Sequence, residues 1–204
     1  MRISQAVVAG VVTALAVSVA GCGSNPTSST SKSGSATSAT STRSSAPTSS
    51  APAQPSEYTG LLIQATDIDA PIPFTASPPT NNPNGQPGVA TTFKDEDGSH
   101  VIKDTIQVFA DPAAATNALN AAKGQQGGAV KDPTTQSSDV GTGGTMLLGN
   151  SPDRSKGVTI LLFTEGKAFV TLEFDGPPET LAPPDFVNNV GQKQDAVVKK
   201  GLGG

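Results

Sequence analysis

The chain has 204 residues, with 13 basic and 17 acidic side chains and a formal net charge of −4. A protein that binds nucleic acid needs a basic face, so this acidic balance argues against a nucleic-acid partner. The chain has one histidine and one cysteine. Structural zinc sites take several such ligands, and an internal disulfide needs two thiols, so both are excluded.

The N-terminus has the parts of a secretory signal peptide. A short segment carrying Arg2 precedes an apolar run from Ala6 to Ala20, which ends in small residues. This run is shorter than the roughly 20 residues of a transmembrane helix. Residues 1–21 are therefore predicted to be a leader that is absent from the mature protein.

The four residues Val19-Ala20-Gly21-Cys22 resemble a bacterial lipobox. The resemblance implies that the Cys22 thiol receives a diacylglycerol group, that the preceding peptide is cleaved, and that the new N-terminus is acylated. Cys22 is thus the expected lipidation site, and it would tether the chain to the extracytoplasmic face of the cell membrane. Two alternatives stay open: a cleaved leader that leaves Cys22 as a free thiol, and an uncleaved membrane anchor.

Residues 22–57 are predicted to be a disordered linker. Ser and Thr supply 19 of the 34 residues from Ser24 to Glu57, and large apolar side chains are absent. Nothing in the linker offsets the conformational entropy that folding would cost. Tracts of Ser, Thr and Pro also resemble O-glycosylated stalks, so this linker is either a glycosylated stalk or an unmodified spacer.

Residues 58–204 are long enough for one domain of ordinary size. The apolar cluster Tyr58–Ile63 is expected to be a strand or a single helical turn. The Pro-rich stretch from Ala70 to Gly88 is expected to be a long ordered loop. Two strands then follow, Val89–Phe93 and Ser99–Phe109, joined around Asp97-Gly98, a dipeptide typical of hairpin turns.

The second half of the domain alternates helical and strand patterns. Asp111-Pro112 is a typical helix start, and the Ala-rich residues continue the helix to Lys123. The later elements are strands and a final helix. They are predicted at Thr145–Leu148, Val158–Phe163 and Ala168–Phe174, with a helix that begins at an Asp185 cap.

Hairpin-paired strands with helices packed on a face define an α+β domain, here a mostly antiparallel sheet with two helices. The core face of the clearest strand pair is assigned to alternate apolar residues on each strand. These are Val158, Ile160 and Leu162 on one strand and Val170, Leu172 and Phe174 on the other.

The residue inventory argues against an enzyme. The only histidine, His100, follows the Asp97-Gly98 turn, and it is interpreted as an exposed turn residue. The run Asp95-Glu96-Asp97 lacks the spacing of a calcium loop and is interpreted as a solvated turn. No catalytic residue, metal site or cofactor is therefore predicted.

Binding is the function that remains. Ile72 and Phe74 place apolar groups in the Pro-rich loop, which either folds over the sheet or offers a contact surface. A cleft between helix and sheet is a further way for such a domain to hold an apolar ligand. The expected function is a non-enzymatic binding or accessory module for a partner protein or envelope component. The alternative is a carrier or chaperone of an apolar ligand such as a glycolipid.

The lipobox, the Ser/Thr/Pro linker and the cysteine-free domain together resemble small mycobacterial or actinobacterial cell-envelope lipoproteins. Within the domain, the stretch Gly60–Ile68 is similar to the opening of sensor-type extracytoplasmic domains of that group. The order of predicted elements is similar to the PsbP/Mog1-like fold of some of its members. The resemblance implies an extracytoplasmic, lipid-anchored location.

Overall fold

The computed structural model describes residues 55–125 and 128–203. The predicted leader, the lipidation site Cys22 and nearly all of the predicted linker lie outside these residues. The described part has the following helices and strands: η1 (Pro55–Leu61), η2 (Ala65–Asp67), β1 (Thr75–Ala76), β2 (Thr80–Asn81), η3 (Pro83–Gly85), β3 (Gly88–Lys94), β4 (Val101–Val108), α1 (Pro112–Gln125), β5 (Lys131–Ser137), β6 (Thr142–Asn150), β7 (Gly157–Glu165), β8 (Ala168–Gly176) and α2 (Pro184–Leu202).

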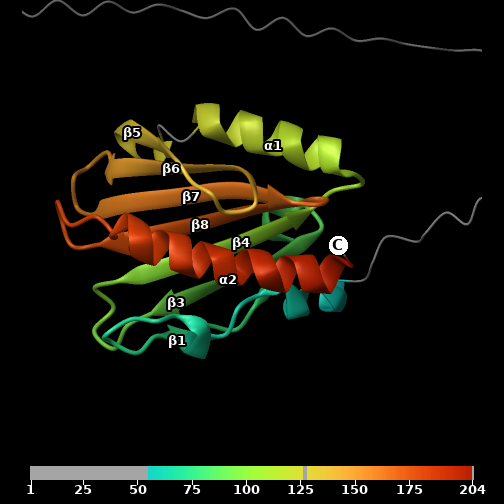
Figure 1. The fold of residues 1–204 in the computed structure, drawn as a ribbon. Coiled ribbons are helices and arrows are strands. Elements are labelled where there is room, and N and C mark those ends of the chain that lie inside the picture. Colours follow the sequence, from blue (N-terminus) through green and yellow to red (C-terminus); the bar gives the residue numbers. More distant parts are fainter. Residues whose placement is uncertain (1–54, 126–127, 204) are drawn as a thin grey trace, which may run out of the picture. The chain divides into compact units, whose positions relative to one another are not determined.

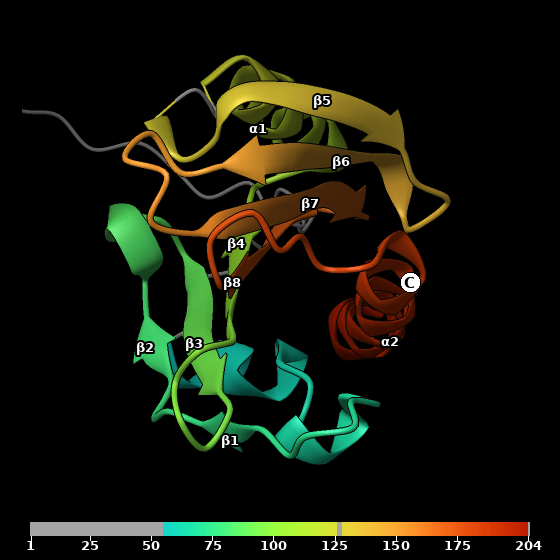
Figure 2. The ribbon, with the colours of Figure 1, turned by 90° about the vertical axis from the view of Figure 1, so that its left-hand side faces the viewer.

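The strands form one antiparallel sheet, in the order β1-β3-β4-β8-β7-β6-β5, with β2 also paired to β3. The β3–β4 hairpin and the β6–β7–β8 meander meet where β4 pairs with β8. The sheet curves around α2, which lies on its concave side, while α1 lies on the convex side (Figure 1 and Figure 2). The prediction of an α+β domain with a mostly antiparallel sheet and two packed helices is confirmed.

The two helices pack on opposite faces of the sheet, not on a shared one. In the β7–β8 register, Leu161 pairs with Leu172 and Phe163 with Val170, and all four belong to the core under α2. Ile160 and Leu162 project to the other face and pack with Leu119 of α1. The predicted core face was therefore wrong. Val158, Ile160 and Leu162 face α1, whereas Val170, Leu172 and Phe174 face α2.

Helix α2 supplies the larger apolar surface. Its Val187, Val190 and Val198 are fully buried, as their spacing predicts. The helix begins at Pro184, with Pro183 as its N-cap, so Asp185 lies in the first turn rather than at the cap. Proline suits the first turn because the amide hydrogens there have no partner within the helix. Within the described residues, no helix has the length and hydropathy needed to cross a membrane.

Several elements depart from the predicted ones. The segment predicted as a strand or helical turn forms the 3₁₀ helix η1, which agrees with the second alternative. The Pro-rich loop contains the short strands β1 and β2, which add to the edge formed by β3. Strand β5 was not predicted. Six of its seven residues are exposed, so it has no alternation of apolar and polar residues.

A buried glutamine fastens α2 to the start of the domain. Gln194 is fully buried, its Oε1 accepts a hydrogen bond from the Ile63 amide at 3.0 Å, and its Nε2 donates to the Leu61 carbonyl. A buried polar group that loses its partner costs roughly 1–3 kcal/mol. The two bonds therefore hold the C-terminal helix against a segment more than 130 positions earlier in the chain.

Asp104, on the concave face of β4, is completely buried. Neither carboxyl oxygen has a hydrogen-bond partner within the described part of the chain. Burial raises the pKa of Asp104 to about 8, because a charged carboxylate is poorly stabilised away from water. The side chain is therefore largely protonated at neutral pH.

We expect Asp104 to make the fold less stable as the pH rises. The unfolded chain loses this proton near pH 4 and the native protein only near pH 8, so the native state binds more protons between these values. The free energy of unfolding should fall across this window by at most about 1.4 kcal/mol per pH unit. Urea unfolding at pH 5 and pH 8 should show Asp104→Asn flattening this slope and stabilising the protein at pH 8.

The exposed Asp139→Asn is the matched control, because it makes the same chemical change without altering a buried site. It should keep the wild-type slope. An unchanged slope in Asp104→Asn would show that Asp104 does not carry this pH dependence.

Candidate functional site

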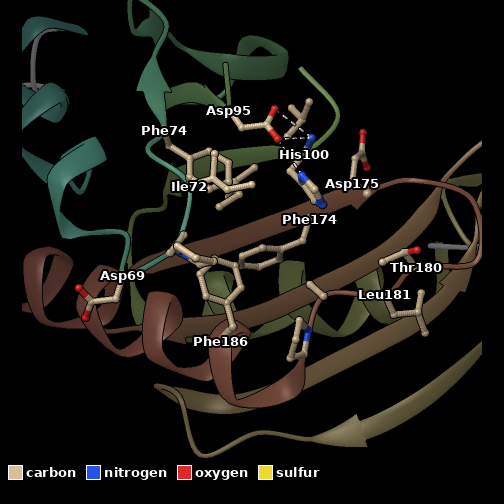
Figure 3. Close-up of a pocket in the computed structure, with 17 residues that line it drawn as sticks. Asp69, Ile72, Phe74, Asp95, His100, Phe174, Asp175, Thr180, Leu181 and Phe186 are labelled. Atoms are coloured by element: carbon tan, nitrogen blue, oxygen red, sulfur yellow. Dashed lines mark hydrogen bonds and ion pairs between the residues drawn. The ribbon is translucent and has the colours of Figure 1, made fainter. Parts of the chain in front are cut away.

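An apolar pocket of about 420 Å³ opens beside the N-terminus of α2. Its walls come from residues 69–74 of the Pro-rich segment, the start of β4, the end of β8, and residues 176–186 (Figure 3). Its volume lies within the range of roughly 300–1,000 Å³ that is typical of small-molecule sites. We call it the apolar pocket below.

Three phenylalanines and two isoleucines give the apolar pocket its character. Phe174 and Phe186 meet edge to face, with ring centroids 5.8 Å apart and an interplanar angle of 74°. Ile102 forms part of the floor, and Ile72 and Phe74 come from the Pro-rich segment. In Figure 3 the Phe174 and Phe186 rings lie next to each other, with Ile72, Phe74 and His100 across from them.

Exposed apolar surface is concentrated at this pocket. Among the described residues, only Ile72 and Leu181 are large hydrophobic side chains that remain exposed, at 45% and 38%. Both line the apolar pocket. Single exposed apolar residues are common on protein surfaces, but two that gather at one concave site indicate a surface for an apolar partner.

The pairing of β4 with β8 builds the floor of the apolar pocket. In this register Ile102 lies opposite Phe174, and Val101 lies opposite Asp175. Residues of opposed pairs share a face of the sheet, so Ile102 and Phe174 both face the concave side. The floor is therefore made by two strands that are distant in sequence.

The segment between β8 and α2 forms a second wall, and glycine lets it approach the sheet. The Gly157 amide donates to the Pro177 carbonyl at 3.1 Å, and the Thr180 amide donates to the same carbonyl at 3.0 Å. A side chain on Gly157 would collide with the backbone of Thr180. The close contact at Gly157 thus positions Thr180 and Leu181 at the pocket.

A buried carboxylate holds the histidine at the pocket. Asp95 Oδ2 accepts from His100 Nδ1 at 2.7 Å, and both carboxylate oxygens accept from the His100 amide. Ser99 Oγ also donates to Asp95. Although burial opposes the charged form, the hydrogen bonds from His100 and Ser99 lower the pKa of Asp95 to about 2. Asp95 is therefore ionised at neutral pH.

These contacts correct two interpretations of the sequence. Asp95 is only 6% exposed, so the acidic run is not a wholly solvated turn, although Glu96 and Asp97 are exposed. His100 is partly buried and lines the apolar pocket, so it is more than an exposed turn residue. The acidic run looks solvated in sequence because its partners, Ser99 and His100, lie beyond the turn.

The Ser99, His100 and Asp95 side chains do not have the geometry of a hydrolytic triad. In a triad the acid binds one ring nitrogen and the serine binds the other. Here Ser99 Oγ and Asp95 Oδ2 both lie at Nδ1, at 3.0 and 2.7 Å. This arrangement orients the imidazole ring but does not place the hydroxyl for proton transfer to Nε2.

The other carboxylates at the apolar pocket are also paired. Asp69 pairs with Lys193 at 2.7 Å, and Asp175 Oδ2 pairs with Lys156 at 2.8 Å and with Lys103 at 3.1 Å. Burial opposes ionisation of Asp175, but the two lysines hold its pKa below the usual value. The pocket therefore combines an apolar interior with acids that are neutralised by the protein itself.

The sequence singled out part of this site. Ile72 and Phe74 were expected either to fold over the sheet or to offer a contact surface, and the structure brings both to the apolar pocket. His100, which was interpreted only as an exposed turn residue, lines the same pocket. Leu181 was missed, since a lone leucine among prolines carries no periodic signal. Within the described residues, no group of three or more His, Cys, Asp or Glu side chains is arranged to hold a metal ion.

Comparison with known proteins finds similarity among solved structures. No family model matches the chain, and no curated protein matches it. Among solved structures, the extracellular domain of PknH from Mycobacterium tuberculosis is similar, with a TM-score of 0.49 and 9% sequence identity. The alignment covers 76% of this chain and 99% of that domain. A similarity at this level establishes neither a shared family nor a shared function.

We expect Asp95 to set the tautomer of His100. An ionised carboxylate only accepts hydrogen bonds, so the neutral imidazole must carry its proton on Nδ1. Nitrogen-15 NMR of the His100 ring at high pH should therefore report the Nδ1–H tautomer. In Asp95→Ala the ring should return toward the Nε2–H form that free histidine prefers. The same ring spectrum in both proteins would contradict this role of Asp95.

Proposed function

We propose that this chain is a lipid-anchored, extracytoplasmic envelope protein whose domain binds the apolar part of an envelope component and performs no catalysis. The observation that carries the proposal is the apolar pocket, at which the two exposed large hydrophobic side chains of the described domain come together. An apolar group that enters it would remove this surface from water, at a gain of roughly 25 cal/mol per Å².

The chemistry of the pocket supports binding rather than catalysis. His100 is the only histidine of the chain, and Ser99 lies at the wrong ring nitrogen to be activated by it. The other acids at the pocket are occupied by lysines. A general base must reach its proton in a substrate pose. The groups on this surface instead fix one another in place.

A small apolar ligand fits this site better than a protein partner. A stable protein interface buries roughly 800 Å² on each partner. Apart from Ile72 and Leu181, the described domain exposes no large hydrophobic side chain. A concave site with two exposed apolar residues matches the acyl chain or similar group of a lipid more closely than a broad interface. The carrier of an apolar ligand is thus the favoured form of the proposal.

The anchor is the second part of the proposal, and it is supported by the sequence Val19-Ala20-Gly21-Cys22. Two or more acyl chains hold a protein stably at a membrane, whereas one chain does so only marginally. A linker of some 34 residues would let the domain sample the surroundings of its anchoring point.

Labelling with palmitate tests the anchor directly. We expect radiolabelled palmitate to be incorporated into the wild-type protein when it is expressed in an actinobacterial host, and not into Cys22→Ala. Full-length wild type and variant should be compared by immunoprecipitation and autoradiography. Label that persists in Cys22→Ala would disprove lipidation at this residue.

Substitution of Ile72 tests the pocket. The side chain is 45% exposed, so Ile72→Asn should fold normally while it removes apolar contact area from the ligand. Loss of part of one buried isoleucine should weaken binding of 1-octanol by about 1 kcal/mol, or roughly fivefold. Isothermal titration calorimetry of the full chain with 1-octanol measures the affinity.

Ala196→Asn is the control, because it adds the same polar side chain at an exposed position of α2 that does not line the pocket. It should bind 1-octanol as the wild type does. If wild type fails to bind 1-octanol, or if Ile72→Asn binds it equally well, the apolar pocket is not the binding site.

A further inference from the structure

A second, polar hollow of about 630 Å³ lies next to the apolar pocket. It is lined by residues of β5 and β6, by Arg154 in the turn before β7, and by Glu179 and Leu181 in the segment before α2. We call it the polar pocket. Leu181 lines both pockets, so the two sites adjoin at this side chain.

The floors of the two pockets belong to one row of paired residues across the sheet. Ile102 and Phe174, which line the apolar pocket, are paired with each other. Leu148 and Thr134, which line the polar pocket, are also paired. Thr159 lies between them, paired with Phe174 on one side and Leu148 on the other. Since opposed pairs share a face, both pockets lie on the concave face of the sheet.

Thr159 has an unusual environment for a hydroxyl group. It is completely buried, and its Oγ1 has no hydrogen-bond partner among the described residues. Buried hydroxyl groups are usually paired, because an unpaired one costs free energy. Thr159 lines neither pocket, so its unpaired hydroxyl lies beneath the row that joins them and is not itself a contact for a ligand.

The charges at the polar pocket are of both signs and are not paired within the protein. Lys131 and Arg154 carry positive charge, and Asp132 and Glu179 carry negative charge. None of these four side chains makes a hydrogen bond or an ion pair within residues 55–125 and 128–203. The acids at the apolar pocket, in contrast, all have a hydrogen-bond or ion-pair partner within the protein.

This set of groups suits an uncharged head group that carries hydroxyls. A hydroxyl donates to a carboxylate and accepts from a cation, so it can use both kinds of side chain. The amide of Gln136 adds a further donor and acceptor, and the Asn150 amide adds a donor, since its Oδ1 already accepts from the Glu179 backbone amide. A phosphate or sulfate would instead meet two carboxylates together with the two cations. Repulsion by the carboxylates would offset most of the attraction to the cations.

Three residues at the polar pocket have a left-handed backbone conformation that residues other than glycine rarely adopt. Asp132, Arg154 and Glu179 have φ values of 46°, 59° and 61°, and they are three of the five non-glycine residues with positive φ in the described chain. Such conformations cost roughly 1–3 kcal/mol each and gather at ligand sites. Here they lie at one hollow, which adds to the case for a ligand.

We infer that the two pockets form one binding site for an amphiphile, with its apolar chain in the apolar pocket and an uncharged, hydroxyl-bearing head in the polar pocket. Leu181 forms the boundary that the ligand crosses. This inference rests on the proposed function, because the apolar pocket must hold the chain. It adds the class of ligand and a second subsite.

Three probes with the same chain length separate the contributions of chain and head. Octyl glucoside, 1-octanol and octyl phosphate share an octyl chain and differ in the head: a sugar, a lone hydroxyl and an anion. Calorimetric titration of the full chain, below the concentration at which each probe forms micelles, should show octyl glucoside binding about tenfold more tightly than the other two. One or two added hydrogen bonds to charged groups correspond to roughly this factor.

Glycine substitutions remove the head-group contacts without disturbing the backbone, since glycine adopts positive φ freely. Arg154→Gly and Glu179→Gly should each weaken octyl glucoside binding several-fold and leave 1-octanol binding unchanged. Asn84→Gly is the matched control. Asn84 also has positive φ, at 56°, but lies outside both pockets, so this variant should bind all probes as the wild type does.

The outcomes separate this inference from the proposed function. If 1-octanol and octyl glucoside bind wild type equally well, the polar pocket is not a head-group subsite, although the apolar pocket stands. If octyl phosphate binds most tightly and Arg154→Gly removes that preference, the head is an anion and the inference is overturned. If none of the probes binds, the proposed function fails as well.

Discussion

The pairing of β4 with β8 is the interaction on which the rest of the domain depends. Its eight residue pairs run from Val101 with Asp175 to Val108 with Ala168, and the paired residues lie 60 to 74 positions apart in the chain. This pairing joins the β3–β4 hairpin to the β6–β7–β8 meander. It also places Lys103 beside Glu173 and aligns Ile102 with Phe174 as the pocket floor. Without it, neither a continuous sheet nor a site would exist.

The curved sheet and α2 enclose groups that stabilise the fold and one group that destabilises it. They surround a core in which Val187, Val190 and Val198 are buried and Gln194 is fully bonded. The same core contains Asp104 without a partner. A buried polar side chain of this kind lowers stability, and natural proteins seldom keep one without a reason.

Local sequence patterns predicted the elements whose ends are set by neighbouring residues, such as tight turns and helix caps. The Asp97-Gly98 turn indicated the β3–β4 hairpin, and Asp111-Pro112 marked the start of α1, where Asp111 accepts a hydrogen bond from the Ala114 amide. Strand β5 escaped prediction because a polar edge strand has no buried face to impose alternation. The face of β7 was assigned wrongly because a strand buried on both sides is apolar at nearly every position. Alternation then says nothing about which residues face which helix.

The site was less predictable than the fold, because its parts meet only through distant contacts. Ile72 and Phe74 drew attention as apolar residues in a Pro-rich loop, but no local pattern connects them with Phe186 or Leu181. The partnership of Asp95 and His100 spans a turn and is invisible in an acidic run. These groups are placed by the register between strands that are distant in the chain. Local patterns in a single sequence do not give that register.

The walls of the apolar pocket come from both ends of the folded domain, residues 69–74 near its start and residues 176–186, which lead into its last helix. With a single cysteine, the chain has no covalent means of linking these ends. An occupant that touches both walls would act as a removable cross-link. Because it binds only where the walls have already met, it would stabilise the folded chain, and the stabilisation would grow with the logarithm of its concentration. A loaded protein would thus resist unfolding and proteolysis longer than an empty one.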